Sequence, residues 1–536
     1  MPVSGARRWL ALIAVAMSLL VVGLDLTVLN LALPTIATAL HASTGDLQWF
    51  NDAYSLVLAA AVLPAGMLGD RYGRKKVLLT SLALFGLSSA ACAYAATAGE
   101  LIAARAILGL GAAAIMPLSL AIIPVLFTPA ERQRATAIMA STIFLSFPIG
   151  PLVGGSLLDH FWWGAVFLIN VPVVTLALIA VAILMPESRS EQRPRMDYTG
   201  VALSSLGLAG LTYGIIRAGQ DGWSNATAVA TIAAGVVFLA AFVAWERVAG
   251  RVTSAQPLIE LRLFRSAGFT WGTILATLVA FAMFGIMFAM PQYFQEVRGA
   301  NAFGSGLRML PMIGGMLVGM IAGTRLQSPR RNSAGLPREP LTGAKTMVTV
   351  GFAVMAAALA VGAFTTITSG TGFAAAWFAV TGLGLGTAMP SAMNAALGAL
   401  SADRSGAGSA LITAMRQVGA TIGVAVLGTI LNSAYRSHLA LTGLPAPISS
   451  AAKSSVAAGV AVAHALRSAP LLESVRTAFV HGMDIMLWTC GGIALVSAVL
   501  AAAFLPGRSG QVSEGEAGPI GAGTGETGPE RAGLGL

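Results

Sequence analysis

The stretch Gly66-Met-Leu-Gly69-Asp70-Arg71-Tyr-Gly73-Arg74-Lys75-Lys76 joins two long apolar segments and places an acid and closely spaced glycines among cations. Small residues such as Gly66 and Gly69 let neighbouring membrane helices approach closely. Asp70 ends an apolar segment beside cations, so a local charge network can form there and break when a helix shifts slightly. A loop that only marks the cytoplasmic side would explain the cations but not the spacing of Gly and Asp. We therefore predict a conformational gate formed by Gly66, Gly69, Asp70, Arg71, Gly73 and Arg74.

Around this stretch the composition is strongly apolar. The chain has 536 residues, of which 56% are hydrophobic and 10% are charged, and its mean hydropathy is +0.78. A soluble domain carries about 25% charged residues because its surface must stay hydrated. This composition excludes an ordinary soluble enzyme and predicts an all-α polytopic membrane protein.

The net charge of +10 does not indicate nucleic-acid binding, because the cations lie between the apolar segments rather than in a basic stripe. The five histidines show no paired ligand spacing, so we expect no metal site. The sequence has no Gly-rich phosphate loop of the Walker type, so we expect neither a cofactor nor ATP as the energy source.

Fourteen apolar segments are long enough to cross a bilayer, since about 20 helical residues span its core of about 30 Å. They cover residues 9–32, 48–69, 77–97, 101–123, 136–158, 164–185, 198–217, 226–246, 268–291, 305–326, 343–364, 371–393, 406–431 and 483–505. The first segment follows two arginines, as a signal peptide would, but continues past Asp25 to Leu33. We therefore interpret it as an uncleaved span.

The distribution of cations predicts the orientation in the membrane. Of the 32 Lys and Arg residues, 23 fall in the N-terminal tail and the alternate loops on its side, 7 fall on the other side and 2 lie within spans. Cations are enriched on the cytoplasmic side of membrane proteins. We predict a multi-pass protein of the cell membrane with both termini in the cytoplasm, acting as a monomer.

An internal repeat divides the chain. Gly109-Leu-Gly111 through Met116-Pro117 matches Gly382-Leu-Gly384 through Met389-Pro390 at an offset of 273 residues, and the same offset relates Gly150 to Gly423 and Gly155 to Gly428. Such parallel repeats build transporters. We predict two six-helix bundles plus two inserted helices. The predicted parts are an N-terminal bundle (1–190), an inserted pair (191–250), a C-terminal bundle (251–508) with an extracellular loop at about 432–482, and a disordered cytoplasmic tail (509–536).

Three charged residues lie at a similar shallow depth in the predicted spans, namely Asp25, Asp52 and Arg105. A charge inside a membrane span is costly and marks a functional site by default. Burial raises the pKa of a carboxyl group and a nearby arginine lowers it again, so such a group can take up or release a proton as helices rearrange. We predict that all three serve proton coupling, with Asp25 as the carrier and Arg105 as the partner either of Asp25 or of the substrate. Asp25 could instead be a fixed hydrogen-bonding acid, and Asp52 could simply favour the start of its helix.

Arg416 lies deep in the second half of the chain, beside Gln417. Both side chains could line a central substrate cavity, or they could bond to the backbone and to other helices. The sequence leaves these alternatives open.

The stretch at 66–76 resembles the signature of the major facilitator superfamily. Leu24-Asp25-Leu-Thr27 through Asn30 to Pro34, and Arg105 followed by Gly109 and Gly111, resemble motifs of its fourteen-helix drug:proton antiporters. The same family is matched by Phe167-Leu-Ile-Asn170-Val-Pro172 and Pro291-Gln292-Tyr293-Phe-Gln295. The antiporter motif of that family, which is associated with export, is matched by Gly150, Pro151, Gly154 and Gly155.

This resemblance implies the major facilitator fold and a secondary multidrug or antibiotic efflux transporter. Such a protein exchanges small-molecule drugs for protons across the lipid bilayer by alternating access. The candidates for the substrate cavity are Asn30, Gln292, Tyr293, Arg416 and Gln417. A proton-coupled importer or exporter of a specific metabolite on the same fold remains an alternative. A membrane enzyme acting on lipids is disfavoured, because no nucleophile or metal cluster with oriented acids is evident.

Overall fold

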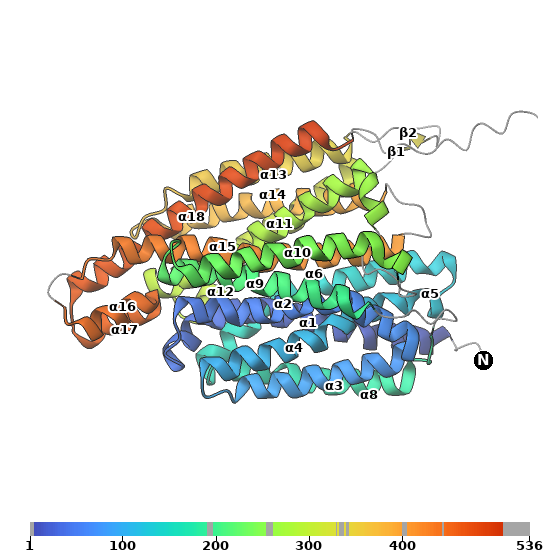
Figure 1. The fold of residues 1–536 in the computed structure, drawn as a ribbon, viewed down its shortest axis with the longest axis horizontal. Coiled ribbons are helices and arrows are strands. Elements are labelled where there is room, and N and C mark those ends of the chain that lie inside the picture. The colour runs from blue at the N-terminus through green and yellow to red at the C-terminus, as the bar shows by residue number, and fades with distance from the viewer. Residues whose placement is uncertain are drawn as a thin grey trace, which may run out of the picture.

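The computed structural model describes an almost entirely helical protein whose long helices run side by side (Figure 1). The described residues are 5–189, 197–252, 261–327, 330–331, 337–338, 342–398, 405–441 and 444–506. The predicted tail at 509–536 lies outside them, as do parts of the linkers on either side of the predicted inserted pair.

The first half of the chain forms helices that are separated by short connections. They are α1 (Gly5–Ala39), α2 (Thr44–Tyr72), α3 (Arg74–Ala93), α4 (Ala98–Ala121), α5 (Ile123–Leu126), α6 (Pro129–His160), α7 (Ala165–Leu168) and α8 (Asn170–Leu184). Ser43 and Asp46 form a reciprocal capping box that starts α2. Gly73, with φ of 114°, separates α2 from α3 in a backbone conformation that side chains disfavour.

Two further helices, α9 (Tyr198–Asp221) and α10 (Ala226–Val252), form the inserted pair and precede the second half. The second half contains η1 (Leu261–Arg265), α11 (Ala267–Gln292), η2 (Tyr293–Val297), α12 (Ala302–Gln327), the strands β1 (Arg330–Arg331) and β2 (Pro337–Arg338), α13 (Ala344–Gly362), α14 (Thr371–Leu397), α15 (Ser405–His438), α16 (Ala446–Ser454), α17 (Val456–Ala465) and α18 (Ala469–Phe504).

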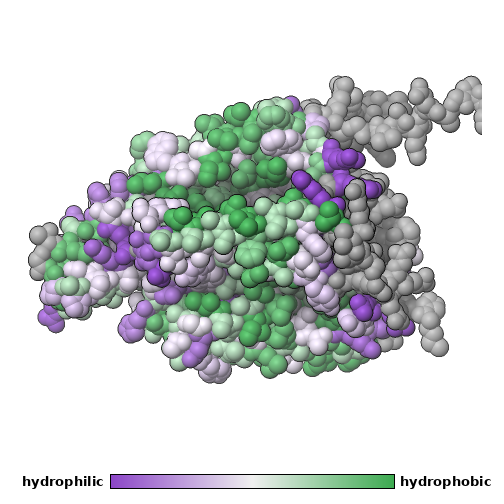
Figure 2. Space-filling view, in the orientation of Figure 1, coloured by the Kyte–Doolittle hydropathy of each residue, from purple (hydrophilic) through white to green (hydrophobic). Residues whose placement is uncertain are grey.

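Twelve helices among the described residues are long and apolar enough to cross a membrane. They coincide with twelve of the fourteen predicted spans. The other two predictions, 48–69 and 136–158, fall on α2 and α6, which are helices of 29 and 32 residues but are not among the twelve. Large apolar side chains remain exposed along the middle of the molecule, and hydrophilic side chains gather toward its ends (Figure 2). These features make the chain a multi-pass membrane protein.

The ends of two long helices fall within the predicted extracellular loop at 432–482. Helix α15 continues to His438 and α18 already begins at Ala469, so residues 439–468 connect them and contain the short helices α16 and α17. Both long helices extend beyond their apolar segments because polar residues such as Arg436 and Arg476 can continue a helix. An apolar run therefore marks the membrane-embedded part of a helix and not its ends.

The packing of the two halves follows the sequence repeat. A Cβ atom on Gly109 or Gly111 of α4 would meet the backbone of α2 or α3, and a Cβ atom on Gly382 or Gly384 of α14 would meet the backbone of α12 or α13. In the same way, α6 packs on α1 in the first half and α15 packs on α11 in the second. One large hydrophobic core comes mainly from residues 11–185 and the other mainly from residues 263–505.

Among the described residues, the halves are joined by α2 with α15, by α6 with α12, and by α1 with α11, α12 and α17. The inserted helix α9 packs against both α2 and α15, and therefore covers one of these junctions. The hairpin of α16 and α17 lies at the end of the molecule away from the N-terminus (Figure 1), near the turn at residues 40–43. We refer to this end as the distal end.

Candidate functional site

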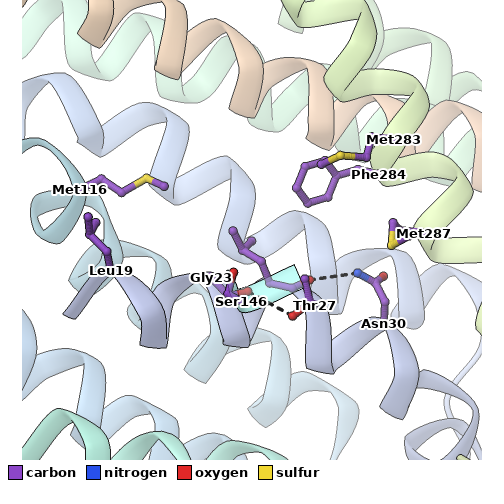
Figure 3. Close-up of a pocket in the computed structure, with 10 residues that line it drawn as sticks. Leu19, Gly23, Thr27, Asn30, Met116, Ser146, Met283, Phe284 and Met287 are labelled. Atoms are coloured by element: carbon purple, nitrogen blue, oxygen red, sulfur yellow. Dashed lines mark hydrogen bonds between the residues drawn. The ribbon is translucent and has the colours of Figure 1, made fainter. Parts of the chain in front are cut away.

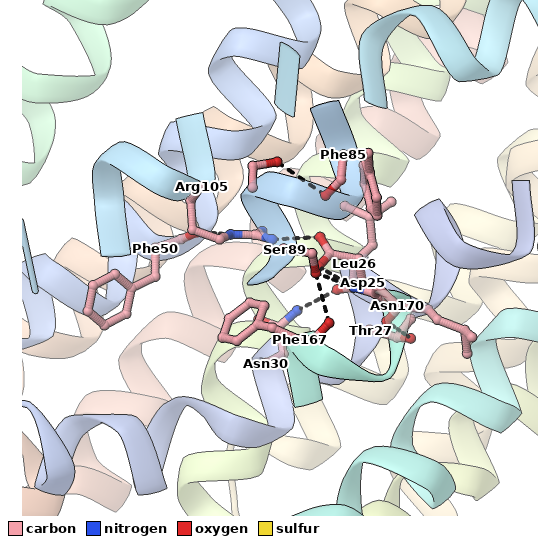
Figure 4. A network of polar contacts seen from close by, with 12 residues as sticks. Asp25, Leu26, Thr27, Asn30, Phe50, Phe85, Ser89, Arg105, Phe167 and Asn170 are labelled. Carbon is pink, nitrogen blue, oxygen red and sulfur yellow. Dashed lines mark hydrogen bonds and ion pairs between the residues drawn. The ribbon is translucent and has the colours of Figure 1, made fainter. Parts of the chain in front are cut away.

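Asp25 and Arg105 form an ion pair inside the first half. The Arg105 Nη1 atom lies 2.5 Å from the Asp25 Oδ2 atom, and the two side chains are only 1% and 2% exposed. Helix α1 supplies the acid and α4 supplies the guanidinium group (Figure 4). Removing one member of such a pair leaves an uncompensated buried charge, which costs about 3–5 kcal/mol.

Neutral groups complete the surroundings of this pair. The Asn170 amide of α8 donates to Asp25 Oδ1 at 3.3 Å and to the hydroxyl of Ser89 at 3.1 Å (Figure 4). Arg105 Nε donates to the backbone carbonyl of Phe50 at 2.9 Å, and its guanidinium carbon lies 4.4 Å from the centre of the Tyr54 ring. Five helices, α1, α2, α3, α4 and α8, therefore meet at one polar network.

Sequence reasoning selected Asp25 and Arg105 but did not identify all of their partners. Asn170 was noticed only as part of a motif, whereas Ser89 and Tyr54 carried no signal that separates them from other small or aromatic residues of membrane helices. The structure does not bring Asp52 into the network. Its side chain is buried on α2, its Oδ2 atom has no hydrogen-bond partner, and no ion pair links it to Arg105 among the described residues.

A small cavity lies on the other side of α1, between the two halves. It is lined by Leu19, Gly23, Leu26, Thr27 and Asn30 of α1, by Met116 of α4 and Ser146 of α6, and by Met283, Phe284 and Met287 of α11 (Figure 3). Asn30 accepts a hydrogen bond from the Asn51 amide and donates to the Leu26 carbonyl. Helix α1 thus separates the ion pair from the cavity, and the same helix contributes to both.

The glycines of the predicted antiporter motif allow α6 to pack closely against α1. A Cβ atom on Gly150 would collide with Thr27, and one on Gly154 would lie 2.7 Å from Val28. A Cβ atom on Gly155 would lie 2.6 Å from the Phe303 backbone, so this glycine instead brings α6 against α12. The motif therefore fits α6 tightly against α1 and against the second half.

The residues of the predicted gate lie where α2 meets α3. A Cβ atom on Gly69 would collide with Leu118 of α4. The Arg74 backbone N–H donates to the Ser188 carbonyl at 2.8 Å, and its guanidinium group donates to the Ala121 carbonyl at 3.1 Å. The guanidinium carbon of Arg71 lies 5.5 Å from the ring of its neighbour Tyr72.

Gly66 approaches Pro117, and Gly73 lies against Glu187, a residue that sequence reasoning did not select. Glu187 also accepts a hydrogen bond from the Lys75 backbone at 3.1 Å. The side chain of Asp70 lies outside the described part of the structure. The described contacts connect this corner to α4 and to the end of α8, all within the first half.

The other candidates for the substrate cavity lie elsewhere in the second half. Gln292 is buried and donates to the Phe288 carbonyl at 2.9 Å, while the buried Tyr293 donates to the Thr366 carbonyl at 3.4 Å. The Arg416 Nη1 atom donates to the Met393 sulfur at 3.9 Å, and its Nε atom has no hydrogen-bond partner among the described residues. The Nε2 atom of Gln417 is also without a partner. Of the five candidates, Asn30 lines the described cavity.

Comparison with known proteins decides the family. The family model described as Major Facilitator Superfamily matches residues 15–424. The chain belongs to the major facilitator superfamily. Within this superfamily it is 33% identical to the tetracenomycin C resistance and export protein of Streptomyces glaucescens, over 93% of this chain and 92% of that protein. It is 36% identical to the multidrug efflux pump LfrA of Mycolicibacterium smegmatis, over 89% of this chain and 92% of that protein.

Solved structures place the chain in the same fold. A bacterial homologue of the human lysosomal transporter Spinster, in an inward-facing and unoccupied conformation, aligns with a TM-score of 0.67 at 17% identity, covering 94% of this chain and 98% of that one. A D-xylose–proton symporter aligns with a TM-score of 0.59 at 14% identity, covering 93% and 98%. The family predicted from the sequence is thus confirmed, and this major facilitator protein is a transporter rather than an enzyme.

Proposed function

We propose that this protein exports drug-like or antibiotic small molecules from the cell in exchange for protons, by alternating access. The observation that carries the proposal is the position of α1, which holds Asp25 in a buried ion pair on one side and lines the cavity on the other. The names of the relatives, which include a multidrug efflux pump and an antibiotic export protein, support export of this class of cargo.

The proposed topology has fourteen transmembrane helices, with α2 and α6 added to the twelve apolar ones. Both pack inside the bundle, α2 against α4 and α15 and α6 against α1 and α12, so apolar neighbours cover much of their surface. The two hydrophobic cores support a division into the bundles 1–190 and 251–508, with an inserted pair at 191–250. Together with the distribution of cations, this topology puts both termini in the cytoplasm and the distal end outside.

Contacts between the halves close the distal end. Asp159 at the end of α6 accepts hydrogen bonds from the Asn301 side chain at 2.6 Å and from the backbone of Ala302 at 3.1 Å, where α12 begins. Gln48 of α2 donates to the Ala425 carbonyl of α15 at 3.1 Å. In the proposed topology these bonds hold the transporter closed to the exterior, and they must break when it opens outward.

Proton coupling follows from the electrostatics of the pair. When Asp25 binds a proton it loses its charge, and Arg105 loses its counterion in a buried site. The network then favours a different placement of α1, and with it of the cavity wall formed by Thr27 and Asn30. A membrane potential supplies about 2.3 kcal/mol per charge per 100 mV, which sustains roughly a fiftyfold gradient for one net charge moved.

Energised inside-out vesicles test this proposal. A panel of fluorescent drugs is added to vesicles that contain the parent protein, the Asp25→Asn variant or the Glu246→Gln variant. We expect pH-gradient-driven uptake with the parent, loss of that uptake with Asp25→Asn, and near-parent uptake with Glu246→Gln, because Glu246 is a buried acid of the inserted helix α10, outside the network. Full gradient-driven uptake with Asp25→Asn, or movement of cargo only in the inward direction of an importer, would contradict the proposal.

A further inference from the structure

We propose that the cavity between α1 and α11 selects uncharged, planar aromatic molecules over cations of the same shape. This inference rests on the proposed function and names the class of cargo for it. Three methionines from two helices line the cavity: Met283 and Met287 lie near the ring of Phe284, and Met116 lies near Leu19 (Figure 3). Thioether sulfur atoms contact aromatic rings favourably, and flexible methionine side chains can adapt to differently shaped ligands.

None of the described residues that line the cavity is charged. All ten lining residues are apolar or neutral, and the polar ones among them are Thr27, Asn30 and Ser146. Asp25 of α1 is not among the lining residues, and its charge is paired with that of Arg105. A cation that entered this cavity would lose its hydration without gaining a counter-charge, which is strongly unfavourable.

The polar side chains of Thr27 and Asn30 already make hydrogen bonds within the protein. The Thr27 hydroxyl donates to the carbonyls of Gly23 and Leu24, and the Asn30 amide is held between Leu26 and Asn51. What they offer a ligand is a fixed hydroxyl oxygen and the second N–H of one amide. Such groups suit the carbonyl and hydroxyl substituents of an aromatic ring system, and they cannot compensate a full charge.

The small size of the cavity, about 30 Å³, agrees with a conformation that holds no cargo. Its walls come from both halves, with α1, α4 and α6 on one side and α11 on the other. Movement of the halves, together with rotation of the three methionine side chains, can widen it into a slot between Phe284 and α1. A flat ring system fits such a slot.

Two planar dyes that differ in charge test whether charge decides which molecules are transported. Nile red is planar and uncharged, whereas ethidium is planar and carries one positive charge. In energised inside-out vesicles we expect the parent protein to transport Nile red at least about tenfold faster than ethidium, relative to protein-free vesicles. The Phe284→Leu variant should lower Nile red transport by up to about tenfold, and Met287→Leu, which keeps the volume, by less.

The Met287→Asp variant is the sharpest test, because it adds a carboxylate to the lining. It should raise ethidium transport and lower Nile red transport. Met486→Leu is the control, because Met486 is buried in α18 away from the cavity, and it should leave the preference unchanged. Transport of ethidium as fast as Nile red by the parent protein would overturn this inference and leave proton-coupled export intact. The inference would also be overturned, with proton-coupled export left intact, if Phe284→Leu and Met287→Asp both kept the parent's preference for Nile red over ethidium.

Discussion

The two halves of the molecule share a packing scheme but differ in the chemistry of their cores. At the repeat offset of 273 residues, the position of Arg105 in α4 falls on Phe378 in α14. Arg105 pairs with Asp25 and lies over Tyr54, whereas Phe378 is fully buried and contacts the rings of Phe294 and Trp377. The comparison supports the proposal that the first half carries the proton, while Met283, Phe284 and Met287 of the second half form an apolar wall of the cavity.

We expect the largest loss of stability when Arg105 of the first half is replaced by phenylalanine, the residue at the corresponding position of the second half. The Arg105→Phe substitution leaves Asp25 charged, buried and unpaired, so we expect it to destabilise the protein by about 3–5 kcal/mol. Thermal unfolding in detergent measures this loss. Adding Asp25→Asn to Arg105→Phe should recover a substantial part of the stability, since the unpaired charge is then gone. If the double variant is no more stable than Arg105→Phe, the ion pair is not the source of the loss.

Gly150 and Gly423, which the repeat relates, allow the packing of the two halves to be compared at one position. A Cβ atom on Gly423 would lie 2.8 Å from the Phe281 Cα atom, and backbone cannot easily yield, so Gly423→Ala should cost about 1–3 kcal/mol. A Cβ atom on Gly150 would meet the Thr27 side chain instead. Gly150→Ala should therefore cost less stability but slow transport, because it displaces α1 beside Asp25.

Gly314→Ala is the matched control for both glycine variants, since a Cβ atom there meets nothing within 4 Å. Thermal unfolding and vesicle transport would be measured on all three proteins. Equal losses of stability at Gly150 and Gly423, with normal transport by Gly150→Ala, would show that the contact of α6 with α1 has no special role.

Removing a neutral partner of the acid should have a smaller effect. In the Asn170→Ala variant, Asp25 Oδ1 and the Ser89 hydroxyl each lose a hydrogen bond. A hydrogen bond to a charged group contributes about 1.5–3 kcal/mol, and the long 3.3 Å contact puts this one at the lower end. Thermal unfolding in detergent measures this loss, and a melting temperature equal to that of the parent would show that Asn170 does not support the ion pair.

The smallest expected effect concerns the contact of α1 and α6 at the end of the molecule opposite the distal end. Glu131, which precedes the predicted span of α6, binds Arg8 at 3.0 Å. A hydrogen bond from the Thr128 side chain, helped by the charge of Arg8, holds the pKa of Glu131 below its ordinary value of 4.5. A lowered pKa in the folded state means that the carboxylate stabilises the fold above its ordinary pKa, and that this contribution is lost as the pH falls through the folded value.

Thr128→Ala should therefore move this acid-induced loss to higher pH, and Glu131→Gln should abolish it. Melting temperatures between about pH 5 and pH 3 measure the difference. Identical acid profiles for Thr128→Ala and the parent would show that the cap at the start of α6 does not act through Glu131.

The sequence predicted the fold well because membrane-spanning helices are recognisable by their long apolar segments. It also selected Asp25 and Arg105 as candidates for proton coupling, since charges in apolar segments are conspicuous, and that role stays a prediction. It could not pair them, because the rotation of each helix about its axis depends on packing, and Asp52 at a similar depth stays outside the network. The cavity could not be predicted from the sequence. The methionines of α11 look like ordinary core residues there, and only the structure shows that they lie opposite α1.

Proton release on cargo binding tests the coupling of Asp25 to the cavity most directly. Purified protein in weakly buffered detergent is mixed with a transported dye, and the change in pH is recorded for the parent and for Asp25→Asn. The parent should release protons in proportion to the dye bound, and Asp25→Asn should bind dye without releasing any. Equal proton release by both proteins would contradict the assignment of the proton to the buried acid of α1.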